Sequence, residues 1–547
     1  MPTWLRVLNQ QFPIRYWALM LAATGALLSG MTWAGFGQGM WICLACGALV
    51  VLGLRDLRQT QKAIRRNYPI VGRLRYLLEF IRPEIRQYFI ESDAEAAPFS
   101  RAQRSLVYQR AKGESDKRPF GSQVDMHVEG YEWINHSMVP THLASSDFRV
   151  TVGAGRERPY ALSVFNISAM SFGSLSANAI LSLNKGARMG NFAHDTGEGS
   201  ISRHHRVHEG DLVWEIGSGY FGCRDENGQF DEARFVANAT LNQVKMIELK
   251  LSQGAKPGHG GMLPGAKVTA EIAEARGVPE GKDCISPAAH SAFDTPIEML
   301  EFIERLRQLS GGKPVGFKFC VGHPWEWFAI CKAMLHTGIL PDFIVVDGAE
   351  GGTGAAPVEF ADHVGTPLQE GLLLVSNTLV GRNLRDKLRI GCSGKIVSAF
   401  DIARAMALGA DWCNSARGFM FALGCIQAQT CHTGHCPTGV TTQDPHRQQA
   451  LVVTDKAERV RRFHANTLDA LRELVQAAGL THPREIHADH IVRRMSHHEV
   501  RLLSTLVQRV RPGCLLDGEL PSSVFKTYWP MAQAASFSPM AAQAGAA

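Results

Sequence analysis

Short apolar segments alternate with amphipathic helical patterns from Ala161 onward, and this order is typical of parallel β-α-β units. Eight segments fit barrel strands: Leu162–Ser168, Asn191–His194, Val244–Leu249, Cys284–Ser286, Val315–Phe319, Phe343–Val346, Leu388–Gly391 and Trp412–Asn414. Helical patterns between them include Ser176–Met189, Thr295–Leu309, Trp325–His336 and Val397–Leu408. Eight strands in sequence favour a closed TIM-type (β/α)8 barrel of class α/β over an open sheet. A ninth segment, Leu212–Gly217, is expected in an excursion outside the barrel.

Four loops rich in small residues follow predicted strands, at the end of the barrel where such folds bind ligands. Backbone N–H groups after the seventh and eighth strands often hold a phosphate there. No strand–GxGxxG–helix unit is present, so the pattern favours FMN over a nicotinamide cofactor. The candidate cofactor-binding residues are Ser168, Ala169, Met170, Ser171, Lys318, Gly351, Gly352, Thr353, Gly354, Ser393, Gly394, Lys395, Ala416 and Arg417.

Lys318 lies inside an apolar predicted strand, where an unpaired ammonium would be costly to bury. It could balance the negative charge that develops on a reduced flavin ring. A structural ion pair inside the barrel explains the residue equally well. Both interpretations stay open.

A polar, glycine-rich insertion follows the third predicted strand. Lys250, Gln253 and Lys256 in this insertion would suit a substrate that carries carboxylates. A solvated loop is the alternative, but the glycine content and the nearby segment Thr196–Gly199 favour a site.

Three cysteines, Cys425, Cys431 and Cys436, lie close together, and Pro437 follows the last. Such spacing with a Cys-Pro ending is typical of loops that bind iron–sulfur clusters. Three ligands suggest a three-iron cluster, or a four-iron cluster with one outside ligand. Zinc with His432 and His435, or free thiols, are alternatives. The other nine cysteines are scattered, as in reduced cytosolic proteins.

The N-terminal region predicts a membrane anchor. Residues 16–36 and 40–54 are apolar, the turn between them is uncharged, and a dense basic flank follows. The positive-inside rule places both ends in the cytoplasm, with the protein at the inner membrane and the barrel facing the cytoplasm. A cleaved signal peptide and a buried helical hairpin are weaker alternatives. No basic stripe interleaved with aromatics appears later, which argues against a nucleic-acid partner.

The expected organisation has six parts. They are a cytoplasmic N-terminus (1–15), a transmembrane hairpin (16–54), a basic linker and barrel-covering segment (55–150), the FMN-binding barrel with its iron–sulfur loop (151–450), a helical C-terminal extension (451–530) and a disordered tail (531–547).

Several motifs, in order, resemble the flavin-binding synthase domain of glutamate synthase. They are Ile167–Ser174, Thr196–Gly199, Gln253–Gly258, Gly351–Ala355 and the region Leu423–Gln443 with its cysteines. The resemblance covers about residues 150–480. It implies FMN on a TIM barrel and a 3Fe-4S cluster on Cys425, Cys431 and Cys436.

The resemblance also implies an activity and its site residues. Hydride from FMN would reduce 2-iminoglutarate, which forms from 2-oxoglutarate and ammonia. Lys256 would help to hold 2-oxoglutarate, and Glu198 would be a carboxylate on the substrate side. The candidate catalytic residues are therefore Lys256, Glu198, Gln253 and Lys250.

The chain departs from the family pattern at His259 and Met262, where the family has an acidic residue and a glutamine. A lost hydrogen bond to a charged ligand costs about 1.5–3 kcal/mol, so the substrate could be another amine or carbonyl. No amidotransferase or dinucleotide-binding module is evident. We therefore expect free ammonia or an amine as nitrogen donor, and a ferredoxin-like protein or separate reductase subunit as electron donor. A membrane-associated electron-transfer subunit is a further alternative.

Overall fold

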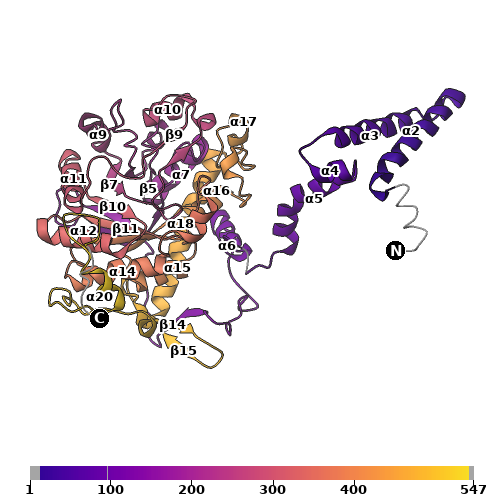
Figure 1. The fold of residues 1–547 in the computed structure, drawn as a ribbon. Coiled ribbons are helices and arrows are strands. Elements are labelled where there is room, and N and C mark those ends of the chain that lie inside the picture. Colours follow the sequence, from indigo (N-terminus) through magenta and orange to yellow (C-terminus); the bar gives the residue numbers. More distant parts are fainter. Residues whose placement is uncertain (1–12, 95–96, 541–547) are drawn as a thin grey trace, which may run out of the picture. The chain divides into compact units, whose positions relative to one another are not determined.

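Eight parallel strands close into a barrel, which confirms the predicted fold class (Figure 1). The computed structural model describes residues 13–94 and 97–540, and the chain divides into two units, before and after the Pro98–Phe99 bond. The barrel strands are β4 (Phe165–Ile167), β5 (His194–Asp195), β6 (Leu212–Ile216), β7 (Val244–Lys250), β10 (Val315–Phe319), β11 (Phe343–Asp347), β12 (Arg389–Ser393) and β13 (Trp412–Ser415). Pairing of β13 with β4 completes the closure.

Amphipathic helices surround the barrel, and each buries an apolar face on the strands or on a neighbouring helix. The longer ones are α6 (Arg101–Lys112), α7 (Ala177–Gly190), α9 (Glu232–Ala239), α11 (Pro296–Leu309), α12 (Pro324–Thr337), α14 (Leu368–Gly381), α15 (Ala399–Ala407) and α18 (Val453–Ala477). Short helices are α8 (Arg203–Arg206), α10 (Ala270–Arg276), α13 (Val358–His363), α16 (Arg417–Leu423) and α17 (Pro445–Gln448). Capping boxes fix the starts of α11 and α15.

Two strand predictions were wrong. Leu212–Ile216, expected in an excursion, is the third barrel strand, and all five of its residues are buried. Cys284–Ile285, expected in the barrel, is β9 and pairs outside it with β8 (Met262–Leu263). Both segments are short and apolar, and only burial on both faces distinguishes a barrel strand. The lysine-rich insertion therefore follows the fourth strand.

The first predicted strand is divided at Val164. Its first half is β3 (Tyr160–Ser163), which forms an antiparallel pair with β2 (Arg149–Val152), and its second half is β4. Only β4 belongs to the barrel.

The C-terminal region is less helical than expected. After α18 it contains β14 (Ile491–Arg494) and β15 (Val500–Leu502), which form a sheet with β1 (Glu132–Ile134), and then α19 (Leu503–Leu506) and α20 (Ser523–Tyr528). The tail was expected to be disordered from Ala532, but Ala532 is buried and its carbonyl accepts a hydrogen bond from Lys332 Nζ at 2.8 Å. Residues 541–547 of the predicted tail lie outside the described residues.

The unit that ends at Pro98 contains the two apolar helices that the sequence predicts. They are α2 (Trp17–Phe36) and α3 (Met40–Arg58), which follow a 3-10 turn at Ile14–Tyr16 and pack on each other through a left-handed turn at Gly37 and Gly39. Both are long and apolar enough to cross a bilayer. Length and composition alone are weak evidence, so membrane insertion stays a prediction, and most of the predicted cytoplasmic N-terminus lies outside the described residues.

Candidate active site

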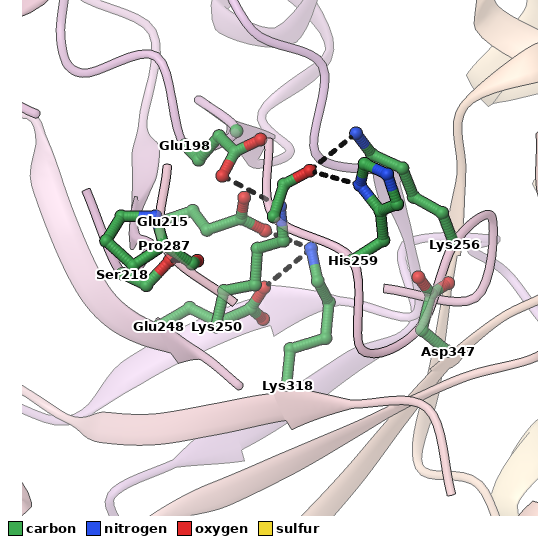
Figure 2. A network of polar contacts seen from close by, with 12 residues as sticks. Glu198, Glu215, Ser218, Glu248, Lys250, Lys256, His259, Pro287, Lys318 and Asp347 are labelled. Atoms are coloured by element: carbon green, nitrogen blue, oxygen red, sulfur yellow. Dashed lines mark hydrogen bonds and ion pairs between the residues drawn. The ribbon is translucent and has the colours of Figure 1, made fainter. Parts of the chain in front are cut away.

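The parallel barrel brings the predicted site loops to one end, because all eight strands point the same way. Lys250 closes β7, Asp347 closes β11 and Ser393 closes β12. Figure 2 shows the polar side chains that meet there and in the barrel interior below.

Two lysines and a glutamate form a polar centre at this end of the barrel, which we call its mouth. Lys250 Nζ lies 3.0 Å from Glu198 Oε2, and Lys256 Nζ donates to the carbonyl of Gly260 at 2.8 Å (Figure 2). Burial alone would raise the pKa of Glu198, but Lys250, Arg276 and Lys256 together lower it. Burial lowers the pKa of Lys256, and Glu198 partly offsets this effect. The centre holds one more cation than anion and can accept a carboxylate.

Within the described residues, Gln253, the fourth predicted catalytic residue, stabilises a turn through its backbone. Its backbone carbonyl accepts a hydrogen bond from Lys256 N at 3.3 Å, which closes the turn that carries the lysine. A side-chain role for Gln253 stays a prediction.

Asp347 connects two loops. One follows β7 and carries Lys256 (the lysine loop), and the other is the predicted phosphate loop after β12. Its Oδ2 accepts a hydrogen bond from Gly254 N at 2.7 Å, and its Oδ1 accepts one from Ser393 Oγ. A Cβ atom at Gly254 would lie 1.8 Å from the carbonyl oxygen of Gly348, so only glycine fits this close approach. One carboxylate therefore fixes two loops that are far apart in the sequence.

The barrel interior holds a buried ionic cluster formed by Asp195, Glu215, Glu248 and Lys318. The Lys318 ammonium pairs with Glu215 and lies 3.4 Å from Glu248 Oε1 (Figure 2). The carboxylates of the cluster approach within 4.8 Å of one another. Of the two interpretations of Lys318, the ion pair is present, and a flavin contact stays a prediction.

Two carboxyl groups of the cluster, those of Asp195 and Glu248, are harder to ionise than exposed ones. Burial and the neighbouring Asp195 raise the pKa of Glu248 well above its usual range, although Lys318 opposes this. Burial and Glu215 raise the pKa of Asp195 to about 7. Three carboxylates around one ammonium would otherwise leave two unbalanced charges in a low-dielectric interior.

The predicted phosphate loops offer free donors. The amide N–H groups of Gly394 and Lys395 have no acceptor within residues 13–94 and 97–540, which leaves them available to an anion. Arg417 Nη2 donates to the carbonyl of Gly352 at 2.5 Å and so joins the loop after β13 to the loop after β11. The neighbouring Ala416 is half-buried at the start of α16.

The loop after β4 lies against the segment that carries Glu198. A Cβ atom at Gly197 would lie 2.7 Å from Ser171 N, and Ser168 N donates to the carbonyl of Ser415 at 3.1 Å. Ser168 and Met170 are buried, and Ala169 and Ser171 are half-buried. These four predicted cofactor residues therefore lie between the segment that carries Glu198 and the eighth strand.

The three cysteines of the predicted cluster loop line one small cavity, with Met420, Thr438 and Thr441 among its other walls. Distant side chains hold the loop in place. Tyr108 Oη donates to the carbonyl of Cys425 at 2.6 Å, and Lys267 Nζ donates to the carbonyl of Cys431 at 2.9 Å.

The three thiols around the cavity are not gathered tightly at one point. Within the described part of the chain, the carboxylates of the ionic cluster are the one set of ligand atoms that lie within 4.8 Å of one another, so the three thiols are spaced more widely. His432 and His435 are exposed and are not among the residues that line the cavity, and the zinc alternative stays a prediction. Burial raises the pKa of Cys425 to about 11, whereas hydrogen bonds from Thr438 and Thr441 outweigh burial and lower the pKa of Cys436.

The cysteine loop touches a predicted flavin loop. A Cβ atom at Gly354 would lie 3.0 Å from His432 N and 3.2 Å from the carbonyl carbon of Cys431. Gly351 makes a similar approach to Ala255, in the lysine loop. The segment Gly351–Gly354, with Thr353 in its turn, therefore lies between the cysteine loop and the lysine loop.

Sequence reasoning missed four acidic residues of the site: Asp195, Glu215, Glu248 and Asp347. Glu215 and Glu248 carry the signal that pointed to Lys318, a charged residue among apolar strand residues. Asp195 and Asp347 directly follow the predicted strands Asn191–His194 and Phe343–Val346, at the ligand-binding end of the barrel, which also marks them as candidates.

Comparisons with known proteins give consistent matches. A family model described as the conserved region in glutamate synthase matches residues 144–481. The glutamate synthase large subunit-like protein YerD of Bacillus subtilis is 38% identical over 83% of this chain and 94% of its own length. The archaeal-type glutamate synthase [NADPH] of Thermotoga neapolitana is 35% identical over 57% of this chain and 59% of its own length. A solved mutant flavocytochrome b2 with pyruvate bound aligns over 76% of this chain and 87% of its own, at 13% identity and a TM-score of 0.41, which is too low to carry an argument.

The raised pKa of Asp195 predicts a pH-dependent stability. The native state binds this proton more tightly than the unfolded chain, whose carboxyl has a pKa near 3.8, so the Asp195 contribution to stability falls as pH rises from about 4 to about 7. Asp195→Asn cannot ionise and removes this loss. We expect the melting temperature of the wild type, relative to Asp195→Asn, to fall by several degrees between these pH values. Asp386→Asn, at an exposed carboxyl, is the control, and parallel curves for wild type and Asp195→Asn would contradict the assignment.

Proposed function

The chain belongs to the glutamate synthase family, and from this premise we propose that it forms glutamate from 2-oxoglutarate and ammonia with FMN and an iron–sulfur cluster. The carbonyl of 2-oxoglutarate condenses with ammonia to an imine and water, and addition of a hydride and a proton gives glutamate. The observation that carries the proposal is the buried pair Lys250 and Lys256 with Glu198 at the barrel mouth.

The two lysines would bind the dicarboxylate. Lys256 Nζ donates to one backbone carbonyl, that of Gly260, so an arriving carboxylate can replace or share this hydrogen bond. Lys250 forms an ion pair with Glu198, and this pair fixes the position of the Lys250 ammonium in the mouth of the barrel. Because both lysines are buried, their interactions with a ligand are weakly screened by water.

The residues present fit both cofactors. Free N–H groups at Gly394 and Lys395 suit the FMN phosphate, and the wide spacing of three thiols around a cavity suits an iron–sulfur cluster, of 3Fe-4S type by the family resemblance. When bound, FMN would supply the hydride, and the cluster would supply single electrons. The contact between Gly354 and Cys431 would keep the two cofactor sites close together.

A second candidate keeps the cofactors and changes the substrate to another amine or carbonyl compound. Met262 is exposed, and it follows Gly261, where a Cβ atom would lie 2.6 Å from Glu198 Oε1. An apolar residue therefore follows directly after a glycine whose backbone approaches Glu198 closely. His259, the other departure, packs edge-on against Phe360 with ring centroids 5.3 Å apart. A membrane-associated electron-transfer role has less support, since it needs no buried lysine pair.

We also propose an external electron donor, either a ferredoxin-like protein or a separate reductase subunit, and attachment to the inner face of a membrane through α2 and α3. The lengths and apolar composition of the two helices support the attachment. The basic flank after α3 supports a cytoplasmic location for that end.

The proposed reaction is tested anaerobically with the purified full-length protein. The flavin is reduced, 2-oxoglutarate and ammonium are added separately and together, and flavin absorbance is recorded. Reoxidation that needs both additions is the expected result. Reoxidation by a different carbonyl–amine pair would favour the second candidate, and flavin that stays reduced with every pair would contradict an imine reductase.

Lys256→Ala is expected to weaken binding of 2-oxoglutarate by roughly tenfold to a hundredfold, because a charge-assisted hydrogen bond contributes about 1.5–3 kcal/mol. Titration calorimetry or the substrate dependence of flavin reoxidation measures this change. Lys282→Ala is the matched control, since Lys282 is an exposed lysine of the same insertion. Equal affinities in the two variants would remove Lys256 from the substrate site.

Cys431→Ser is expected to reduce bound iron and the visible absorbance of the cluster to near background, because one of three thiolate ligands is lost. The barrel should stay folded and retain flavin. Cys514→Ser, a buried cysteine outside the loop, is the control and should keep its iron. Wild-type iron content in Cys431→Ser would contradict the ligand assignment.

A further inference from the structure

The helix after the apolar hairpin carries an apolar face that stays largely exposed among the described residues of its unit. This helix is α5 (Gly72–Ile85), and its apolar residues recur at positions i, i+3, i+4, i+7 and i+11, which places them on one side. They are Leu74, Leu77, Leu78, Ile81 and Ile85. Leu74, Leu77 and Leu78 are each more than half exposed. The chain continues with exposed Tyr88, Phe89 and Ile90.

A buried ion pair fixes the start of α5 to the end of the second apolar helix. Asp56, in the last turn of α3, accepts hydrogen bonds from Arg73 Nε at 2.9 Å and Nη2 at 2.7 Å. It also accepts one from Ile70 N at 3.2 Å. Gly72 packs closely on the short helix α4 (Ala63–Asn67), since a Cβ atom there would lie 2.9 Å from the carbonyl oxygen of Ile64. If α3 crosses a bilayer, α5 must begin at its surface.

The same segment carries the net positive charge of the chain. Residues 55–90 contain nine basic and three acidic residues, and this excess equals the net charge of +6 of all 547 residues. Tyr76 of α5 lies under two cations, Lys62 at 4.6 Å and Arg65 at 4.7 Å from the ring centroid. Arg82 of α5 is exposed on one flank of the apolar face, and Arg86, the first residue after α5, is exposed as well and lies 3.5 Å from Glu91 Oε1. A basic flank beside an apolar stripe is typical of helices that lie in a membrane interface.

We propose that α5 lies in the headgroup region of an anionic bilayer, with its apolar face toward the acyl chains and its arginines among the lipid phosphates. This inference rests on the proposed membrane anchor and adds a second, lipid-selective contact to it. An anionic lipid fits better than a second copy of the chain, because two copies of α5 would bring like charges together.

A photo-crosslinker tests the inference in the full-length protein. The residue p-benzoylphenylalanine is placed at one site in the protein, which is then reconstituted in vesicles of phosphatidylcholine with phosphatidylglycerol and irradiated. Leu78→p-benzoylphenylalanine probes the apolar face of α5. Glu79→p-benzoylphenylalanine is the control, since Glu79 is exposed and lies at least about 100° around the helix from every residue of the apolar face. Leu27→p-benzoylphenylalanine probes the hairpin itself, at an exposed position of α2.

Lipid adducts at Leu78 and Leu27, with few at Glu79, are the expected result by mass spectrometry. Adducts at Leu27 with none at Leu78 would overturn the α5 inference and leave the anchor in place. Crosslinks from Leu78 to another peptide of the same chain, or to a second copy, would also overturn it. An absence of lipid adducts at both sites would overturn the anchor and the inference together.

The charge requirement has its own test. Arg82→Gln with Arg86→Gln should weaken the docking of α5 about fivefold for each arginine removed, since a basic residue near an anionic surface contributes about 1 kcal/mol. The yield of lipid adducts from Leu78 should therefore fall in vesicles with phosphatidylglycerol. It should change little in vesicles of phosphatidylcholine alone. The selectivity for anionic lipid would be overturned if the adduct yield were the same in both lipid mixtures, both for the protein that has the two arginines and for the variant that lacks them.

Discussion

Closure of eight parallel strands into one barrel is the constraint on which the rest of the site depends. Parallel strands with crossover helices have all their carboxyl ends on one side, so loops from distant parts of the sequence meet there. The lysine loop after β7, the acidic loop after β11 and the donor-rich loop after β12 become neighbours for this reason alone. Closure also creates an interior without edges, which must be filled by side chains.

Charged residues are kept in that interior only as a group. Lys318 is surrounded by carboxylates from three other strands, and the raised pKa values of Asp195 and Glu248 oppose the full ionisation that burial would penalise. The ionic cluster lies deeper in the barrel than the polar centre formed by Lys250 and Glu198. A layer of charged side chains therefore lies beneath the mouth of the barrel (Figure 2). This layer connects β5, β6, β7 and β10 across the barrel.

Sequence analysis predicted the features that local patterns of residues encode. It missed the features that depend on contacts between residues far apart in the chain. Glycines of the Gly351–Gly354 segment were candidates for a cofactor loop, but their approach to Cys431 and Ala255 could not be read from spacing. Lys318 attracted attention as a lysine in an apolar strand, whereas Glu215 and Glu248, equally unusual in their strands, did not. The choice between β6 and β9 failed because two short apolar segments look alike until burial on both faces is known.

By itself, the sequence determined the class of fold, the family, the apolar hairpin and the loops that carry the candidate site, because periodicity and motif order are local properties of the chain. Tertiary structure decided which strands close the barrel, that Asp347 fixes two loops at once, and that the cysteine loop touches the segment ending at Gly354. These contacts join residues far apart in the chain, and each depends on side-chain distances that only packing sets.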